Sequence, residues 1–172
     1  NISQKNDRYC ELTALYWAWK NDIKSDYTGL CHYRRYFSFR HNIPLYSHIK
    51  KYFHQDSMDF PYERKVHIDS TSISHIFKTN DIILPKPFRV DSTVKDQYIQ
   101  GHNQHDLCVL HTTLIEMYPE YERAWDIVMN GSELSLFNMF ITRKNIFENY
   151  MTWLFGILFQ VEKYIPPKED AY

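Results

Sequence analysis

Short apolar runs alternate along this chain with longer amphipathic stretches, and this alternation constrains the fold more than any other feature of the sequence. Three runs have the length and apolar content of buried strands, at residues 27–31, 82–84 and 137–141. Strands that alternate with helices predict an α/β fold, in which helices flank a mostly parallel, Rossmann-like sheet. We expect the three strands to lie in one sheet.

Helical spacing is clearest near the N-terminus. Leu12, Leu15, Tyr16 and Trp19 fall at i, i+3, i+4 and i+7, and predict a helix over residues 9–21. Proline or capping residues mark the starts of other helices, and Asp106 is the expected cap of the helix over residues 106–117. The remaining helices are expected from residue 44 to about 53, and over residues 70–77, 92–98, 106–117, 119–129 and 144–164, with a long loop over residues 55–64.

The length and composition describe an ordinary folded domain. A chain of 172 residues fits one domain and buries a core without disulfides. Aromatic residues make up 17%, which suits either a tightly packed core or a sugar-binding surface. The net charge of −1 provides no general attraction to nucleic acid.

The cysteines and the hydropathy predict the compartment. Cys10, Cys31 and Cys108 form no Cys-x-x-Cys pair, and Cys10 and Cys31 lie in apolar patterns typical of small core residues. This usage favours a reducing compartment. No signal-peptide pattern opens the chain, and no run reaches the roughly 18 apolar residues of a membrane span. We therefore expect a cytoplasmic protein.

A cationic and aromatic cluster follows the first predicted strand. His32, Tyr33, Arg34 and Arg35 come where residues 27–31 end, and ligands of open α/β sheets bind beyond the carboxyl ends of strands. Arginine offers bidentate donors to phosphate, and neighbouring aromatic rings suit a flat ring. In a regular strand His32 and Arg34 would share one face and Tyr33 and Arg35 the other. The alternatives are a solvated basic edge strand or structural ion pairs.

Ordered blocks of the sequence carry a resemblance to a known family. The most specific is His32-Tyr33-Arg34-Arg35-Tyr36-Phe37. The others lie at residues 1–6, 11–21, 29–37, 81–87, 118–121, 137–141 and 153–155. In these blocks the chain resembles a family of bacterial proteins encoded with capsular and exopolysaccharide synthesis genes. That family was long catalogued as a domain of unknown function and is now regarded as glycosyltransferases.

The resemblance implies a single glycosyltransferase-like domain over residues 1–172, with a sheet of the glycosyltransferase A type. It also implies that a first strand before Asn1 and a helical segment after Tyr172 are missing. The implied enzyme transfers a hexose, with galactose expected, from a UDP-sugar to a lipid-linked repeat unit of a capsular polysaccharide or exopolysaccharide. It would act at the inner face of the plasma membrane as a peripheral protein.

Sugar transfer needs a stabilised diphosphate leaving group and a base for the acceptor hydroxyl. Many such enzymes hold Mn²⁺ or Mg²⁺ on an Asp-x-Asp motif, which this sequence lacks. We therefore expect any divalent ion to be supporting only. Arg34 or Arg35 would neutralise the diphosphate, while His32 would donate a hydrogen bond or hold a metal, and the shared face favours His32 with Arg34. His102 and Asp106, with His105 between them, are the candidates for general base catalysis.

Two further polar residues are candidates for substrate binding. Glu11, early in the first helix, would bind a ribose hydroxyl or the acceptor, or else would simply favour the helix N-terminus. Asn138 interrupts an apolar strand, where an unsatisfied amide costs about 1–3 kcal/mol. It would bond either core backbone or the acceptor sugar.

Two other functions fit the same residues. A metal-dependent phosphohydrolase would use His102, His105 and Asp106 as one side of a metal site. A carbohydrate-binding module without catalysis would use the abundant aromatic side chains.

Overall fold

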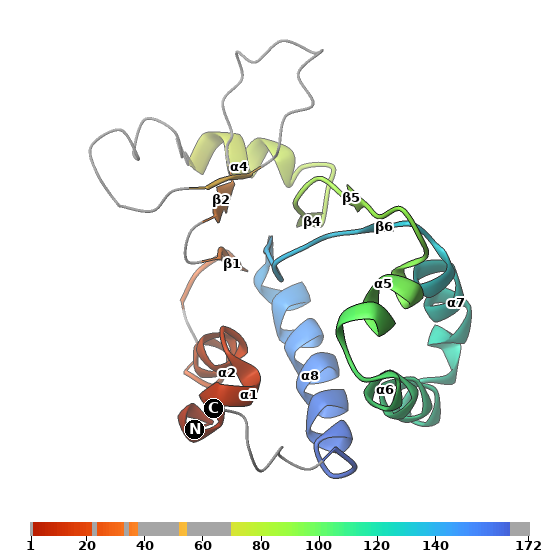
Figure 1. The fold of residues 1–172 in the computed structure, drawn as a ribbon. Coiled ribbons are helices and arrows are strands. Elements are labelled where there is room, and N and C mark those ends of the chain that lie inside the picture. The colour runs from red at the N-terminus through yellow and green to blue at the C-terminus, as the bar shows by residue number, and fades with distance from the viewer. Residues whose placement is uncertain (1, 22–23, 33–34, 38–51, 55–69, 166–172) are drawn as a thin grey trace. The chain divides into compact units, whose positions relative to one another are not determined.

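The computed structural model describes residues 2–21, 24–32, 35–37, 52–54 and 70–165, and it forms two compact units. The first consists of Asn1–Pro87 with Ser135–Glu148, and the second of Phe88–Leu134 with Asn149–Tyr172. Both helices and strands occur, so the α/β class is confirmed (Figure 1).

The first unit contains a three-stranded sheet in the order β1-β7-β4. Its strands are β1 (Tyr27–Leu30), β7 (Phe140–Arg143) and β4 (Ile82–Ile83). Ile141 of the central strand faces Gly29 on one side and Ile83 on the other. The expectation that these three segments share one sheet is confirmed.

The expectation of a mostly parallel sheet is wrong for the strands that the structure describes. Both partners of β7 run antiparallel to it. The strands Arg35–Phe37 (β2) and Tyr52–His54 (β3) are antiparallel to each other, as are Phe88–Arg89 (β5) and Glu133–Leu134 (β6). Alternating helices and strands indicate layers but leave strand direction open. Here the last strand in the chain enters between two earlier ones, a position that does not require the crossover connection of a parallel pair.

The third predicted strand begins later than the sequence indicated. Phe137 has φ 72° and Asn138 has φ 53°, so these two residues form a turn rather than part of a strand. Left-handed backbone cannot continue a pleated strand. The strand β7 therefore starts at Phe140 and extends to Arg143.

The N-terminal helical region is broken in two. After the short η1 (Ser3–Lys5) come α1 (Asn6–Tyr9) and α2 (Leu12–Lys20). Cys10 separates them with φ 43° and ψ −126°, so the helix expected over residues 9–21 begins only at Leu12.

The rest of the first unit corrects one more expectation. The strand β2 (Arg35–Phe37) pairs with β3 (Tyr52–His54), so the end of the helix expected from residue 44 is a strand. The earlier part of that helix and the loop expected over residues 55–64 lie outside the described residues. The helix α4 (Ser70–Ile76) agrees with its prediction.

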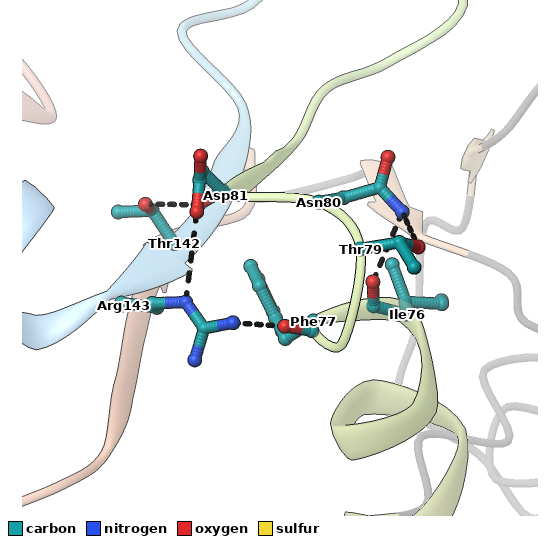
Figure 2. A network of polar contacts seen from close by, with 7 residues as sticks. All are labelled: Ile76, Phe77, Thr79, Asn80, Asp81, Thr142 and Arg143. Carbon is teal, nitrogen blue, oxygen red and sulfur yellow. Dashed lines mark hydrogen bonds and ion pairs between the residues drawn. The ribbon is translucent and has the colours of Figure 1, made fainter.

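Side chains at the end of β7 connect this strand to α4 and β4 (Figure 2). Arg143 donates a hydrogen bond to the Phe77 carbonyl oxygen, and its Nε lies 3.7 Å from Asp81 Oδ1. The buried Thr142 hydroxyl donates to the Asp81 carbonyl oxygen at 2.7 Å. The Phe77 ring is itself buried and stacks on Tyr27 of β1 with centroids 4.6 Å apart. The C-terminal end of β7 thus contacts the segments around Phe77 and Asp81, and the Phe77 ring packs on β1.

The second unit is mainly helical, and its core forms around Val94, Leu107 and Met129. Thr93 and Asn103 cap α5 and α6, so the expectation that Asp106 caps the latter is wrong. The Asn103 side chain accepts the His105 amide at 3.0 Å, and the helix begins two residues before Asp106. The elements are β5 (Phe88–Arg89), α5 (Val94–Gly101), α6 (Gln104–Met117), η2 (Pro119–Tyr121), α7 (Glu122–Asn130) and β6 (Glu133–Leu134).

The long helix α8 (Lys144–Val161) starts directly after β7 and continues into the second unit. It ends slightly before the predicted limit at residue 164. Within the described part of the chain, no helix has the length and apolar character needed to cross a membrane.

We predict that Gly29→Ala strongly destabilises the protein. A Cβ at this position would collide with the Phe140 carbonyl oxygen and lie 2.9 Å from Ile141 Cα, both on the central strand. We expect a loss of about 1–3 kcal/mol in the free energy of unfolding, measured by urea denaturation. Gly101→Ala is the control, because nothing lies within 4 Å of its Cβ position and alanine favours the helix. Equal stability of the two variants would contradict the β1–β7 register.

Candidate functional site

A pair of basic side chains lies just beyond β1. The Arg35 amide donates to the His32 carbonyl oxygen at 3.1 Å, and Arg35 Nη1 lies 3.0 Å from His32 Nδ1. Because arginine can only donate, His32 Nδ1 is the acceptor. The neutral imidazole therefore carries its proton on Nε2, which is a hydrogen-bond donor.

Phe137 supports this pair from the turn before β7. The Arg35 guanidinium carbon lies 3.8 Å from the centroid of the Phe137 ring, and the His32 ring centroid lies 5.7 Å from the same ring. A guanidinium over an aromatic face is attracted by the ring electrons and keeps its hydrogen-bonding edge open. These three residues, His32, Arg35 and Phe137, form what we call the cationic cluster.

The expectation that Arg35 lies on the opposite face from His32 is wrong. Strand alternation predicted that His32 and Arg34 act together, whereas the structure joins His32 to Arg35. Alternation does not apply here because β1 ends at Leu30 and a backbone hydrogen bond links residues 32 and 35. Tyr33 and Arg34 lie outside the described residues.

A second polar contact adjoins the cluster. Asn138 Nδ2 donates to Glu11 Oε1 at 2.8 Å, between residues 127 positions apart in the chain. Asn138 is exposed in the turn, so the expectation of an Asn inside a strand is wrong. Since Phe137 and Asn138 are consecutive, one peptide unit joins the cationic cluster to the Glu11–Asn138 pair. Four residues singled out from the sequence, Glu11, His32, Arg35 and Asn138, thus meet in the first unit.

Unusual backbone conformations are concentrated at this place. Cys10, Phe137 and Asn138 are the non-glycine residues with positive φ in the described part of the chain. Each adjoins or forms the Glu11–Asn138 contact, and such conformations cost about 1–3 kcal/mol each. Backbone strain of this kind gathers at binding and catalytic sites. Nothing in the residue types of Cys10 or Phe137 signalled it, and Cys10 is exposed instead of packed in the core.

The other predicted catalytic residues lie in the second unit. His102 caps the C-terminus of α5 and its ring lies 4.7 Å from the Tyr98 ring, while Asp106 is in the first turn of α6. Burial, and to a lesser extent the Asp106 charge, raise the pKa of the Tyr98 phenol. The catalytic roles of His102 and Asp106 stay predictions.

No group of three or more His, Cys, Asp or Glu side chains suited to a metal ion occurs among the described residues. His102, His105 and Asp106 do not form such a group by themselves, and their use by a phosphohydrolase stays a prediction.

Comparisons with known proteins define the family. The family model described as "Domain of unknown function (DUF4422)" matches residues 1–172, so the chain belongs to this family. A search of curated proteins finds no match. Among solved structures, the chain is similar to the apo structure of WbbM, a bifunctional glycosyltransferase, with a TM-score of 0.82 and 34% sequence identity. The alignment covers 98% of this chain and 31% of the WbbM chain.

We predict that Cys10→Gly stabilises the protein. Glycine adopts positive φ without the steric cost of a Cβ, so we expect a gain of about 1 kcal/mol in the free energy of unfolding. Cys108→Gly is the matched control, because Cys108 is also exposed but lies within α6, where glycine is a few tenths of a kcal/mol (~0.3) less favourable than cysteine. Urea denaturation measures both. A loss of stability in both variants would show that Cys10 is not strained in solution.

We also predict different reactivities of the three thiols. Burial raises the pKa of the Cys31 thiol, while a hydrogen bond from the Phe37 backbone partly opposes this shift. Because only the thiolate reacts, iodoacetamide at mildly alkaline pH should modify the exposed Cys10 and Cys108 well before Cys31. Modification of Cys31 should accelerate only as the pH rises further. Mass spectrometry of peptides over time distinguishes the sites, and fastest labelling at Cys31 would contradict the prediction.

Proposed function

We propose that this chain is a glycosyltransferase domain that transfers a hexosyl group from a nucleoside-diphosphate sugar to a glycan acceptor. The observation that carries the proposal is the cationic cluster beside the Glu11–Asn138 pair, in a chain 34% identical to a bifunctional glycosyltransferase over 98% of its length. The cluster suits the diphosphate of the donor, and the pair suits hydroxyl groups.

The cationic cluster has the chemistry that a departing diphosphate requires. When the bond between the sugar C1 and the phosphate oxygen breaks, its electron pair moves onto that oxygen. Arg35 directs one guanidinium nitrogen at His32 and keeps further N–H donors for phosphate oxygens. Its stacking on Phe137 restricts the side chain before the ligand binds, which reduces the entropy lost on binding. His32 Nε2 is a second donor, and Arg34 remains part of the proposed phosphate site with Tyr33 beside it.

The Glu11–Asn138 pair has the chemistry for recognising hydroxyl groups. The hydrogen bond from Asn138 engages one oxygen of the Glu11 carboxylate and orients the other. A carboxylate accepts from a hydroxyl, and the Asn138 amide oxygen is a further acceptor. We assign this pair to a hydroxyl of the ribose or of the acceptor.

The finer features of the proposal rest on the family resemblance. The donor is a UDP-hexose, with galactose as the expected sugar, and the acceptor is a lipid-linked repeat unit of a capsular polysaccharide or exopolysaccharide. The enzyme works at the cytoplasmic face of the plasma membrane, with Mn²⁺ or Mg²⁺ as an auxiliary ion. His102 and Asp106, which are candidates because of their spacing in the sequence and not because of the resemblance, supply the base that accepts the proton of the acceptor hydroxyl.

We predict that Arg35→Ala weakens UDP binding by roughly 10- to 100-fold, because it removes a charge-assisted hydrogen bond of about 1.5–3 kcal/mol. UMP binding should change less, since the proposed contact is to the diphosphate. Arg123→Ala is the matched control, because Arg123 is an exposed arginine on α7 in the other unit. Arg34→Ala belongs in the same series. Isothermal titration calorimetry measures binding, and thermal melting reports the fold.

Two results would contradict the proposal in different ways. If Arg35→Ala melts at a much lower temperature and its folded fraction binds UDP normally, Arg35 only holds the turn together. If the unaltered chain binds sugars but neither UDP nor UMP, the alternative of a carbohydrate-binding module without catalysis is correct.

A further inference from the structure

The second unit contains a groove that the proposed donor site does not use. Its volume is about 450 Å³, within the range of small-ligand sites. One wall is a single face of α6, because the residues are spaced three or four positions apart. They are His105, Cys108, Val109, Thr112, Thr113 and Glu116. Tyr164, just beyond the end of α8, lines the groove as well.

This face of α6 is distinct from the face that holds the helix in place. Leu107 and Leu114 are buried, and Leu107 belongs to the core of the unit. On the groove side His105, Thr112 and Glu116 are exposed, and Tyr164 is 56% exposed. The side chains of His105, Thr112 and Glu116 have no hydrogen-bond or ion-pair partner within the described residues. The described part of the chain therefore leaves their polar atoms unengaged.

The residues that line the groove indicate which kind of ligand it can bind. Its fixed charge is the carboxylate of Glu116, and neither lysine nor arginine is among the lining residues, which disfavours a phosphate or diphosphate. Hydroxyl, imidazole and carboxylate groups suit a ligand with many hydroxyls. A pyranose ring also has an apolar C–H face, and the exposed ring of Tyr164 offers a flat apolar surface for it.

We propose that this groove binds a neutral pyranose unit of an oligosaccharide. Tyr164 stacks on the C–H face of the sugar, and Glu116 and Thr112 hydrogen-bond to its hydroxyls. Identifying that oligosaccharide as the acceptor glycan rests on the proposed transferase function, whereas sugar binding in the groove does not. The groove is the place where the second unit would recognise glycan, separately from the donor site of the first unit.

Titration of the ¹⁵N-labelled chain with galactobiose, and separately with cellobiose, tests the inference by NMR. We expect at least one disaccharide to shift the amide signals of residues 105–116 and Tyr164 in a saturable manner. Tyr164→Ala and Glu116→Gln should each weaken this binding about tenfold. Tyr164→Phe should retain it, because stacking does not need the phenol hydroxyl. Glu120→Gln is the matched control, since Glu120 is an exposed carboxylate of η2 outside the groove.

The outcomes separate this inference from the proposed function. Absence of saturable shifts with both disaccharides, or unchanged binding by Tyr164→Ala, would overturn the groove as a sugar site. Shifts in the groove caused by UDP would do the same, because they would make it a nucleotide site. Disaccharide binding here combined with no UDP binding anywhere would support the inference and refute the transferase proposal.

Discussion

The central strand β7 is hydrogen-bonded along both of its edges, and the geometry of the first unit depends on this double pairing. The strand joins β1, which comes early in the chain, to β4 and α4 through the contacts of Arg143 and Thr142 with Asp81 and Phe77. Small residues are required where the backbones meet most closely, as at Gly29. The turn that leads into β7 contacts both the segment that carries His32 and the segment that carries Glu11.

The turn before β7 connects this doubly paired strand to the residues of the candidate site. Phe137 and Asn138 adopt positive φ, so consecutive side chains reach two groups from distant parts of the chain. Phe137 contacts Arg35 after β1, and Asn138 bonds Glu11 at the start of α2. The strained turn persists because the strand that follows it is held on both sides. Strain at an exposed polar turn is hard to explain by packing alone, and is expected where a ligand must be met by fixed donors and acceptors.

The cationic cluster of the first unit and the groove of the second unit are lined by side chains of different charge. The first offers the Arg35 guanidinium on an aromatic ring beside the His32 imidazole, and the second offers a groove of hydroxyl, imidazole and carboxylate groups beside Tyr164. In the proposed transferase, the donor carries a charged diphosphate and the sugar unit bound in the groove is neutral. The division of charge between the two surfaces matches that difference.

The α/β class, the membership of three segments in one sheet and the limits of α4 could be predicted from the sequence, which also singled out Glu11, His32, Arg35 and Asn138 as candidate site residues. Periodicity and residue chemistry are local properties, and a single chain displays them directly. The antiparallel direction of the strands, the break at Cys10 and the contact between His32 and Arg35 come from the tertiary structure alone. These features depend on which distant strand pairs with which, and on backbone strain that only such pairing sustains. Phe137 illustrates the difference: its apolar side chain predicted a buried strand, but its backbone has φ 72° and forms the turn before β7, where its ring contacts Arg35.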